Sequence, residues 1–135
     1  MQKEYQSKNH SKFLIKYHII FVCKYRRQVL CNQQIDDDMK QILFDIANES
    51  DFDIEVMETD KDHIHILASS IPILSPLQIV RKLKQESTHR ICKQHSDILR
   101  RIYWREQTFW TDGYFVSTIG NVSQETVKHY IENQG

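Results

Sequence analysis

The residues best suited to chemistry are two histidines separated by a single residue. His63 and His65 stand in an apolar run whose composition is typical of a β-strand. Alternate residues of a strand point to the same face with Cα atoms about 7 Å apart, so both imidazoles can reach one metal ion. Such a pair holds no metal more often than it holds one, and two imidazoles leave most of a coordination sphere to other ligands. The pair is therefore a candidate metal site that needs further residues.

A second candidate lies near the end of the chain, where a tyrosine and a glutamine stand four residues apart. On a helix, Tyr130 and Gln134 lie on the same side one turn apart, so a nucleophile and a metal ligand could be presented together. A phenol has an ordinary pKa of about 10 and needs a base or a cation to become a good nucleophile. The alternative is that Tyr130 packs with Val127 and Ile131, and the spacing alone favours packing.

Hydrophobic patterning predicts that strands and helices alternate around these residues. The expected elements are a strand over 12–27, a helix over 36–50 that opens with three aspartates, a hairpin of strands over 52–57 and 63–69, a helix from Ser75 and Pro76, a short strand over 114–118, and a last helix capped by Ser123. The order β-α-β-β-α-β-α contains a split βαβ unit. It predicts an α+β fold with an antiparallel sheet and helices on one side.

Length and composition predict a single globular domain over residues 1–135. Of the 135 residues, 40% are hydrophobic and 27% are charged, with 3 Gly and 2 Pro. No apolar stretch approaches the ~18–20 residues that a membrane span needs, and the polar N-terminus lacks the apolar middle of a secretory signal. We therefore expect a cytoplasmic protein with no membrane partner. Its three cysteines form no CxxC pair, so we expect ordinary reduced thiols.

Charged residues are clustered along the chain although the net charge is zero. Residues 1–29 hold seven Lys and Arg and residues 81–105 hold eight, while the segment 36–62 between them holds eleven Asp and Glu. A dipolar surface of this kind could offer one basic side to phosphates. Separate solvated faces explain the same pattern equally well.

Five segments, taken in order, resemble the single-tyrosine HUH transposases of insertion sequences, the IS200-like family. They are YHIIFVCKYRR (17–27), DHIHIL (62–67), RKLKQES (81–87), FWTDGYFVSTIG (109–120) and YIENQ (130–134). The resemblance covers roughly residues 12–134. The HIH segment alone is unspecific, but the five segments together in a chain of this size are very specific.

This resemblance implies a metal-dependent transposase that acts on single-stranded DNA. His63 and His65 match the metal-binding histidines of the family, Tyr130 matches its nucleophile, and Gln134 matches the glutamine that helps to bind the metal. The metal of the family is usually Mg²⁺ or Mn²⁺, which polarises the scissile phosphate. Tyr130 would attack phosphorus and leave a 5′-phosphotyrosine and a free 3′-OH, and strand transfer would reverse that step with another 3′-OH.

The resemblance also implies a fold and partners. Family members have the ferredoxin-like fold, act in bacterial or archaeal cells, and form homodimers in which the tyrosine helix of one subunit completes the histidine site of the other. Their DNA substrates are hairpins near the element ends. Candidate phosphate contacts in this chain are Lys24, Arg26, Arg27, Arg81, Lys82 and Lys84. We expect Arg81, Lys82 and Lys84 on the exposed side of the helix that begins at Ser75 and Pro76. For each of the six basic residues a solvated surface charge is an equally good interpretation.

Several other residues have both a functional and a structural interpretation. Phe109 and Trp110 could stack on an unpaired base, although core packing is favoured. Asp62 could orient a ligand histidine or serve in the hairpin turn. The histidines that lack paired spacing are not expected to be ligands; they are His18, His89, His95 and His129.

Two other functions stay open on the sequence alone. The sequence ends at Gly135, one residue after Gln134, whereas many family members continue further, and a terminal turn frays unless a metal or a partner subunit holds it. A DNA-hairpin-binding relic without cleavage activity is therefore the main alternative. An unrelated metal-dependent hydrolase that uses the HIH pair is the other.

Overall fold

Four strands form one antiparallel sheet in the computed structural model, which describes residues 14–104, 106–118 and 124–134. The strands are β1 (Ile15–Val22), β2 (Phe52–Asp60), β3 (His63–Ser70) and β4 (Phe115–Ser117), in the spatial order β2-β3-β1-β4. The α-helices are α2 (Gln33–Asn48), α3 (Pro76–Gln94), α4 (Ser96–Ile102) and α5 (Gln124–Glu132), and the single-turn 3-10 helices are η1 (Lys24–Arg26) and η2 (Val29–Cys31). Within these ranges no helix has the length and apolar content of a membrane span.

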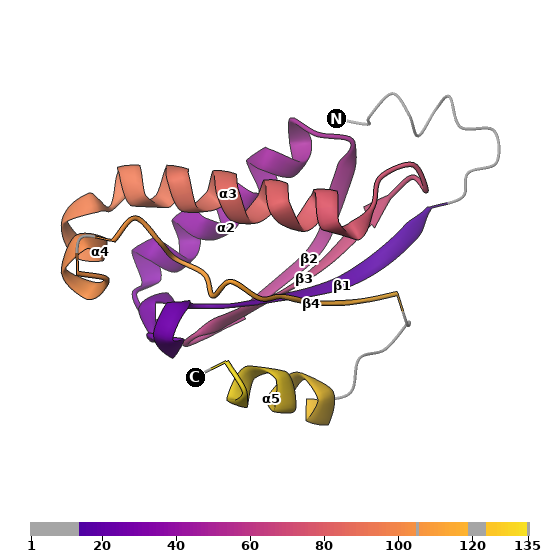
Figure 1. Cartoon of the computed structure of the whole chain (residues 1–135). Coiled ribbons are helices and arrows are strands. Elements are labelled where there is room, and N and C mark those ends of the chain that lie inside the picture. The colour runs from indigo at the N-terminus through magenta and orange to yellow at the C-terminus, as the bar shows by residue number, and fades with distance from the viewer. Residues whose placement is uncertain (1–13, 105, 119–123, 135) are drawn as a thin grey trace.

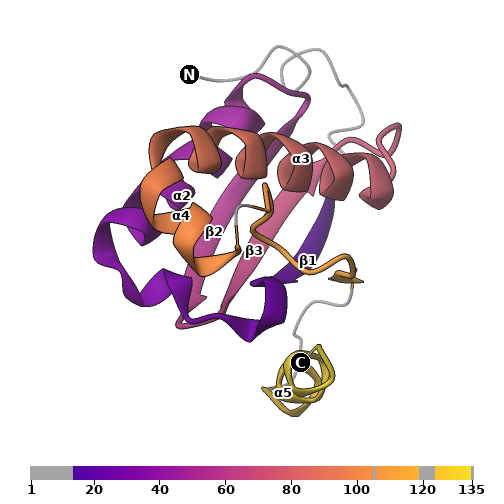
Figure 2. The same ribbon diagram turned by 60° about the vertical axis from the view of Figure 1, so that its left-hand side comes forward.

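The sheet separates two layers of helices. Helices α2 and α3 cover one face, and α5 lies against the other (Figure 1). Figure 2 shows α5 almost end-on, across the sheet from α2 and α3. Because β3 pairs with both β1 and β2 in antiparallel fashion, β1 and β2 run parallel with β3 between them, which is the split βαβ arrangement. The predicted α+β fold with an antiparallel sheet is confirmed.

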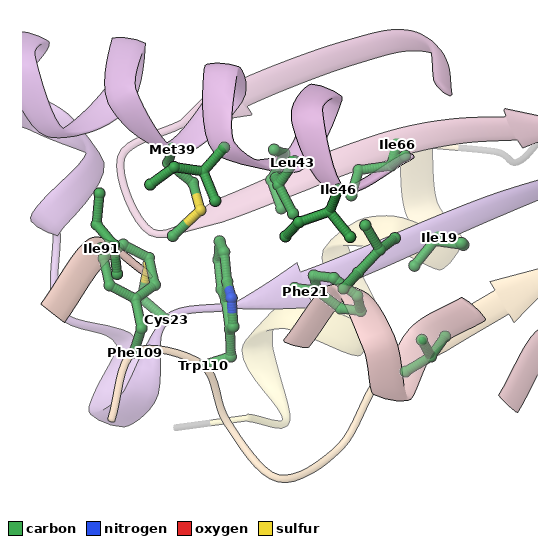
Figure 3. Packing of buried hydrophobic residues seen from close by; sticks show 14 of the residues in the cluster. Ile19, Phe21, Cys23, Met39, Leu43, Ile46, Ile66, Ile91, Phe109 and Trp110 are labelled. Atoms are coloured by element: carbon green, nitrogen blue, oxygen red, sulfur yellow. The ribbon is translucent and has the colours of Figure 1, made fainter. Parts of the chain in front are cut away.

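The main core lies between the sheet and the helices α2 and α3. Ile19 and Phe21 of β1 and Ile64 and Ile66 of β3 point into it, since they alternate with residues of the opposite face. Figure 3 shows the aromatic part of this core, where the ring of Phe21 lies 5.5 Å from that of Trp110. This packing is the hydrophobic surface that holds the sheet and helices together.

Phe109 and Trp110 belong to this core, as the sequence favours. Phe109 is 0% exposed and Trp110 is 4% exposed, with their ring centroids 4.5 Å apart in an edge arrangement. The indole N–H of Trp110 donates to the hydroxyl of Ser87 on α3 at 3.0 Å. Neither ring is available to stack on a base.

A smaller apolar cluster holds α5 on the opposite face. Ile20 and Val22 of β1 are buried there against Ile131, and Val127 and Tyr130 pack at its edge. The prediction that Tyr130 shares a packing face with Val127 and Ile131 is therefore confirmed in part. The predicted cap of this helix, Ser123, lies outside the described residues.

Several element ends differ from the predicted ones, for local reasons. The strand predicted over 12–27 ends at Val22, because Tyr25 and Arg26 adopt left-handed φ values of 58° and 51°. The helix expected from Asp36 begins at Gln33, because the side chain of Asn32 accepts the N–H of Ile35 at 3.1 Å.

Asp36 is buried and accepts the hydroxyl of Thr59 at 2.7 Å. The first hairpin strand extends to Asp60, so the turn is made by residues 61 and 62. Ser75 caps α3 with a reciprocal bond to Gln78, as the Ser-Pro signal predicts. Helix α4 was not predicted.

Candidate active site

A cleft of about 610 Å³ lies over the sheet face that carries the two histidines. The β2-β3 hairpin, the turn after β1 and the helix α5 form its walls. His63 and His65 come from β3, and their alternation with the buried Ile64 and Ile66 makes the same strand both an anchor and a source of ligands. From α5 the lining residues are Val127, Lys128, Ile131 and Glu132. His63 and His65 thus face the same cleft, as their alternate positions on a strand predict.

His63 is oriented by a chain of charged groups. The Oδ1 atom of Asp62 lies 3.0 Å from Nδ1 of His63, and Oδ2 of the same carboxylate accepts Nε–H of Arg26 at 3.3 Å. When Nδ1–H donates to a carboxylate, the lone pair of the ring is left on Nε2, the usual arrangement for a metal-binding histidine. Asp62 therefore contacts the His63 ring and also stands in the hairpin turn, while the role of His63 as a metal ligand stays a prediction.

His65 has a partner that the sequence does not indicate. Its Nε2 atom lies 3.0 Å from Nδ1 of His18 on β1, and the two rings are stacked with centroids 5.2 Å apart. Burial, reinforced by the positive charge that His18 can carry, lowers the pKa of His65 below its ordinary value. His65 is thereby kept neutral, the form in which imidazole binds a metal. A metal bound through this nitrogen would have to replace the contact with His18.

The sheet register also brings carboxylates to the histidines. Glu58 lies opposite His65 and Asp60 lies opposite His63 on the neighbouring strand β2. Nevertheless, among the described residues no group of three His, Cys, Asp or Glu side chains could hold a metal ion. The two imidazoles and their orienting contacts fit a divalent metal as a partial ligand set. The remaining ligands would have to come from elsewhere.

Tyr130 and Gln134 lie together, but not in this cleft. The ring of Tyr130 packs on Phe115 of β4 at 5.8 Å, and Gln134 Oε1 accepts the hydroxyl of Thr111 at 3.3 Å. A β-carbon at Gly113 would lie 3.6 Å from the Tyr130 hydroxyl and 3.4 Å from Gln134 Oε1, so both side chains border the 111–113 loop. The structure thus brings the predicted nucleophile and the predicted glutamine together, while the cleft with the histidines is lined by other residues of α5.

The hydroxyl of Tyr130 is buried, and no hydrogen-bond partner for it is found among the described residues. Burial raises the pKa of Tyr130 to about 12. The nearby Thr111 hydroxyl opposes part of that rise, but it donates its hydrogen bond to Gln134 and not to the phenol. The phenol is therefore protonated at neutral pH in this position. An orphaned buried hydroxyl is uncommon in folded proteins and is a feature of sites that rearrange or bind.

Lys84 holds the loop on which Tyr130 and Gln134 rest. Its ammonium group donates to the carbonyls of Thr111, Asp112 and Gly113 at 2.5, 3.0 and 3.1 Å, which uses all three of its N–H bonds. Burial lowers the pKa of Lys84. The expectation that this side chain lies on the exposed side of α3 is wrong, because the loop carbonyls draw the ammonium inward.

The other predicted phosphate contacts are dispersed. Lys24 lies 3.6 Å from the carboxylate of Asp112, and Arg26 faces Asp62 within the histidine cleft. Arg27 lines a second cleft next to α4. Arg81 and Lys82 are exposed on α3. The structure therefore does not gather the six basic residues into one surface.

Replacement of Lys84 by Met should loosen the 111–113 loop. The substitution leaves three carbonyls without their charged donor, so we expect a loss of about 1–3 kcal/mol in the free energy of unfolding. Faster hydrogen exchange at the Thr111 amide, which donates to the Val22 carbonyl, should accompany it. The matched control is Lys82→Met on the exposed side of the same helix, expected to stay within about 0.5 kcal/mol of the wild type. Equal stability of the two variants would contradict this role of Lys84.

Removal of the Asp62 carboxylate should change the tautomer of His63. In the wild type the carboxylate favours the proton on Nδ1, and in Asp62→Ala that preference is lost. Nitrogen chemical shifts of the His63 ring, measured by long-range ¹H–¹⁵N correlation, report the position of the proton. Glu55→Ala removes a carboxylate from the same hairpin, where it pairs with Lys16 at 3.1 Å and not with His63, and should leave the His63 shifts unchanged. Identical His63 shifts in the wild type and Asp62→Ala would show that Asp62 does not orient the ring.

Comparison with known proteins places this chain among transposases. The sequence profile of the family described as "Transposase IS200 like" matches residues 11–134. The ISDra2 transposase TnpA of Deinococcus radiodurans is 30% identical over 122 residues, which cover 90% of this chain and 85% of that protein. The transposase for insertion sequence element IS200 of Salmonella typhimurium is 31% identical over 126 residues, which cover 91% and 81%.

Solved structures agree with the sequence comparison. The crystal structure of a candidate transposase from Deinococcus radiodurans R1 has a TM-score of 0.83 and 29% identity, and the match covers 99% of this chain and 98% of that one. A REP-associated tyrosine transposase bound to a REP hairpin shares the fold at a TM-score of 0.55 and 15% identity, with coverage of 87% and 62%. On the profile match and the two relatives, the chain belongs to the IS200-like transposase family.

Proposed function

We propose that this protein cuts and rejoins single-stranded DNA at the ends of an insertion sequence, through a 5′-phosphotyrosine and with Mg²⁺ or Mn²⁺. The observation that carries the proposal is the cleft in which His63 and His65 lie beneath α5, the helix that also bears Tyr130. Membership of a transposase family supports DNA as the substrate. Hairpins at the element ends are the proposed recognition elements, since a protein of the same fold has been solved with a REP hairpin.

In the proposed reaction, the Tyr130 oxygen forms a bond to the scissile phosphorus and the bond from phosphorus to the 3′ oxygen breaks. The phenol proton passes to a base, and the leaving oxygen takes up a proton to become a 3′-OH. His63 and His65 would hold the metal, with Gln134 as a further ligand, and a bound divalent metal supplies Lewis-acid polarisation of the phosphate. Rejoining is the reverse attack by a different 3′-OH. No water is consumed, because the phosphodiester energy is kept in the phosphotyrosine.

The proposed active site is shared between two subunits of a homodimer. Within one chain, α5 turns Val127 and Ile131 toward the histidine cleft, while Tyr130 borders the 111–113 loop. A second subunit could supply Tyr130 and Gln134 to the histidines without unfolding this packing. The buried Tyr130 hydroxyl without a described partner would gain one when it meets the phosphate.

The chemistry can be tested by trapping the covalent intermediate. Single-stranded oligonucleotides that span the flanks of the gene are incubated with the protein and Mg²⁺, Mn²⁺ or a chelator, and the products are separated on a denaturing gel. We expect a protein–DNA band that requires metal. It should be lost in Tyr130→Phe, which lacks the nucleophile, and fall at least 100-fold in His65→Ala, which lacks a metal ligand.

Two controls make this assay decisive. Tyr114→Phe removes another tyrosine hydroxyl outside the proposed site and should retain the band. A gel-shift measurement with the same DNA shows whether each variant still binds. Hairpin binding by the wild type with no covalent band under any metal condition would reject the proposed chemistry and favour the DNA-binding relic.

Mixing two inactive variants tests the shared site. In a mixture of Tyr130→Phe and His65→Ala subunits, each mixed dimer contains one site with both wild-type residues if the site is shared. About a quarter of all sites should then be active at equal concentrations. The DNA should be attached to the His65→Ala subunit, which a size tag identifies on the gel. An active wild type with no recovery in the mixture would show that each subunit uses its own Tyr130.

A further inference from the structure

Trp104 is the most exposed aromatic side chain in the described part of the chain. Its side chain is 84% exposed, whereas the other tryptophan, Trp110, is 4% exposed. Exposure of so large an apolar surface costs free energy in water, so an indole in this position commonly marks a contact surface.

A second cleft, of about 400 Å³, surrounds Trp104. It is formed where the turn after β1 meets the end of α4, which lie at the same end of the sheet (Figure 1). Its lining residues are Arg27, Gln28, Val29, Arg101, Ile102 and Trp104. The described lining therefore contains two guanidinium groups and no carboxylate. An aromatic ring and two positive charges in one cleft suit an anionic ligand that has a flat apolar part.

The backbone on both sides of this cleft is strained. Tyr25, Arg26 and Trp104 are the described non-glycine residues with positive φ, at 58°, 51° and 54°. This conformation is costly for a bulky aromatic residue and persists only where surrounding contacts impose it. One such contact ties the two turns together, since the Tyr25 hydroxyl donates to Glu106 at 3.4 Å. This contact links the turn after β1 to the segment that follows Trp104, so the two sides of the cleft are joined.

The Trp104 cleft adjoins the histidine cleft at Gln28. Gln28 lines both of them. The two residues before Gln28 line different clefts: Arg26 lines the histidine cleft and Arg27 lines the Trp104 cleft. A single extended polymer could therefore occupy both clefts at once.

We infer that the Trp104 cleft binds an unpaired base of the DNA strand that flanks the scissile phosphate, with the base stacked on the indole. Arg27 and Arg101 contact the neighbouring backbone phosphates. Stacking on tryptophan accepts any base because every base has a π face, and the two arginines supply the electrostatic attraction. The inference rests on the proposed function, because it assigns the strand in this cleft to the DNA cut in the other.

The two tryptophans allow a direct test with the full chain. Unstructured oligothymidine is titrated into the metal-free protein, and tryptophan fluorescence is recorded. A stacked base should quench the exposed Trp104 and leave the buried Trp110 unchanged, so the quenching should disappear in Trp104→Phe. Affinity measured by anisotropy of labelled DNA should fall about tenfold in Trp104→Ala. Ile73→Ala, which truncates an exposed apolar side chain outside the cleft, is the matched control.

An abasic oligonucleotide of the same length separates stacking from charge. It keeps the phosphates and lacks the bases, so Trp104→Ala should bind it as well as the wild type does, while Arg27→Gln and Arg101→Gln should weaken both DNAs. Unchanged oligothymidine affinity in Trp104→Ala, or an equal loss with abasic DNA, would overturn the inference. A change of molar mass in Trp104→Ala, measured by light scattering, would instead assign the surface to a subunit interface and also overturn it.

This test is independent of the covalent chemistry. It uses no metal and requires no cleavage, whereas the proposed function is judged by the band that depends on Tyr130. A wild-type protein that stacks DNA on Trp104 but forms no covalent band would reject the transposase chemistry and retain the binding site. A covalent band that depends on Tyr130, without any stacking of DNA on Trp104, would retain the transposase chemistry and reject the binding site.

Discussion

The antiparallel register of β1 with β3 is the constraint on which the rest of the structure depends. It sets Ile20 opposite His65 and Val22 opposite His63, and it directs Ile19, Phe21 and their neighbours on β3 into the main core. Since side chains alternate along a strand, a slip of one residue would turn the histidines into the core and the isoleucines into the cleft. Burial of the apolar face therefore fixes the direction in which His63 and His65 point, and no bound metal is needed for this.

The two sides of the sheet are coupled at the 111–113 loop. From the core side, Lys84 of α3 reaches the three loop carbonyls. From the other side, Gln134 and Tyr130 rest on the same loop. The half-buried Lys84 ammonium group donates to three carbonyls, so it restrains the loop backbone more than a solvated lysine would. If the ammonium group moved away, three carbonyl acceptors would lose their donor. Lys84, on the opposite side of the sheet, thus stabilises the loop against which Tyr130 and Gln134 pack.

Contacts within the protein hold the side chains of the histidine cleft in place. His63 is held by Asp62 and indirectly by Arg26, and His65 is held by His18. Candidate ligands held in this way would lose less conformational freedom on binding a cation than mobile side chains would. The same turn that supplies Arg26 continues through Gln28 into the neighbouring cleft around Trp104, so one strained segment borders both concave regions.

The sequence by itself determined the four strands, the helices α2, α3 and α5, and the order of the chemical motifs, but not helix α4. Alternation of apolar residues predicts the β2-β3 hairpin and the exposed face of His63 and His65, and Ser75 with Pro76 predicts the start of α3. These signals are local, since they depend on residues two to four positions apart. The five family segments, read in order, also identify the family correctly.

Only the tertiary structure decided which side chains meet. His18 and His65 are 47 residues apart in sequence, and Lys84 is 27 residues from Thr111. A hydrophobic pattern that repeats every two to four residues carries no information about such distant contacts. From the sequence alone, His18 is therefore not expected at the site and Lys84 is expected on the surface. The two tryptophans show the same limit: Trp110 is buried and Trp104 is exposed, although both stand in similar aromatic surroundings of the sequence. Burial depends on what the rest of the chain packs against a residue, and that is decided when the layers assemble.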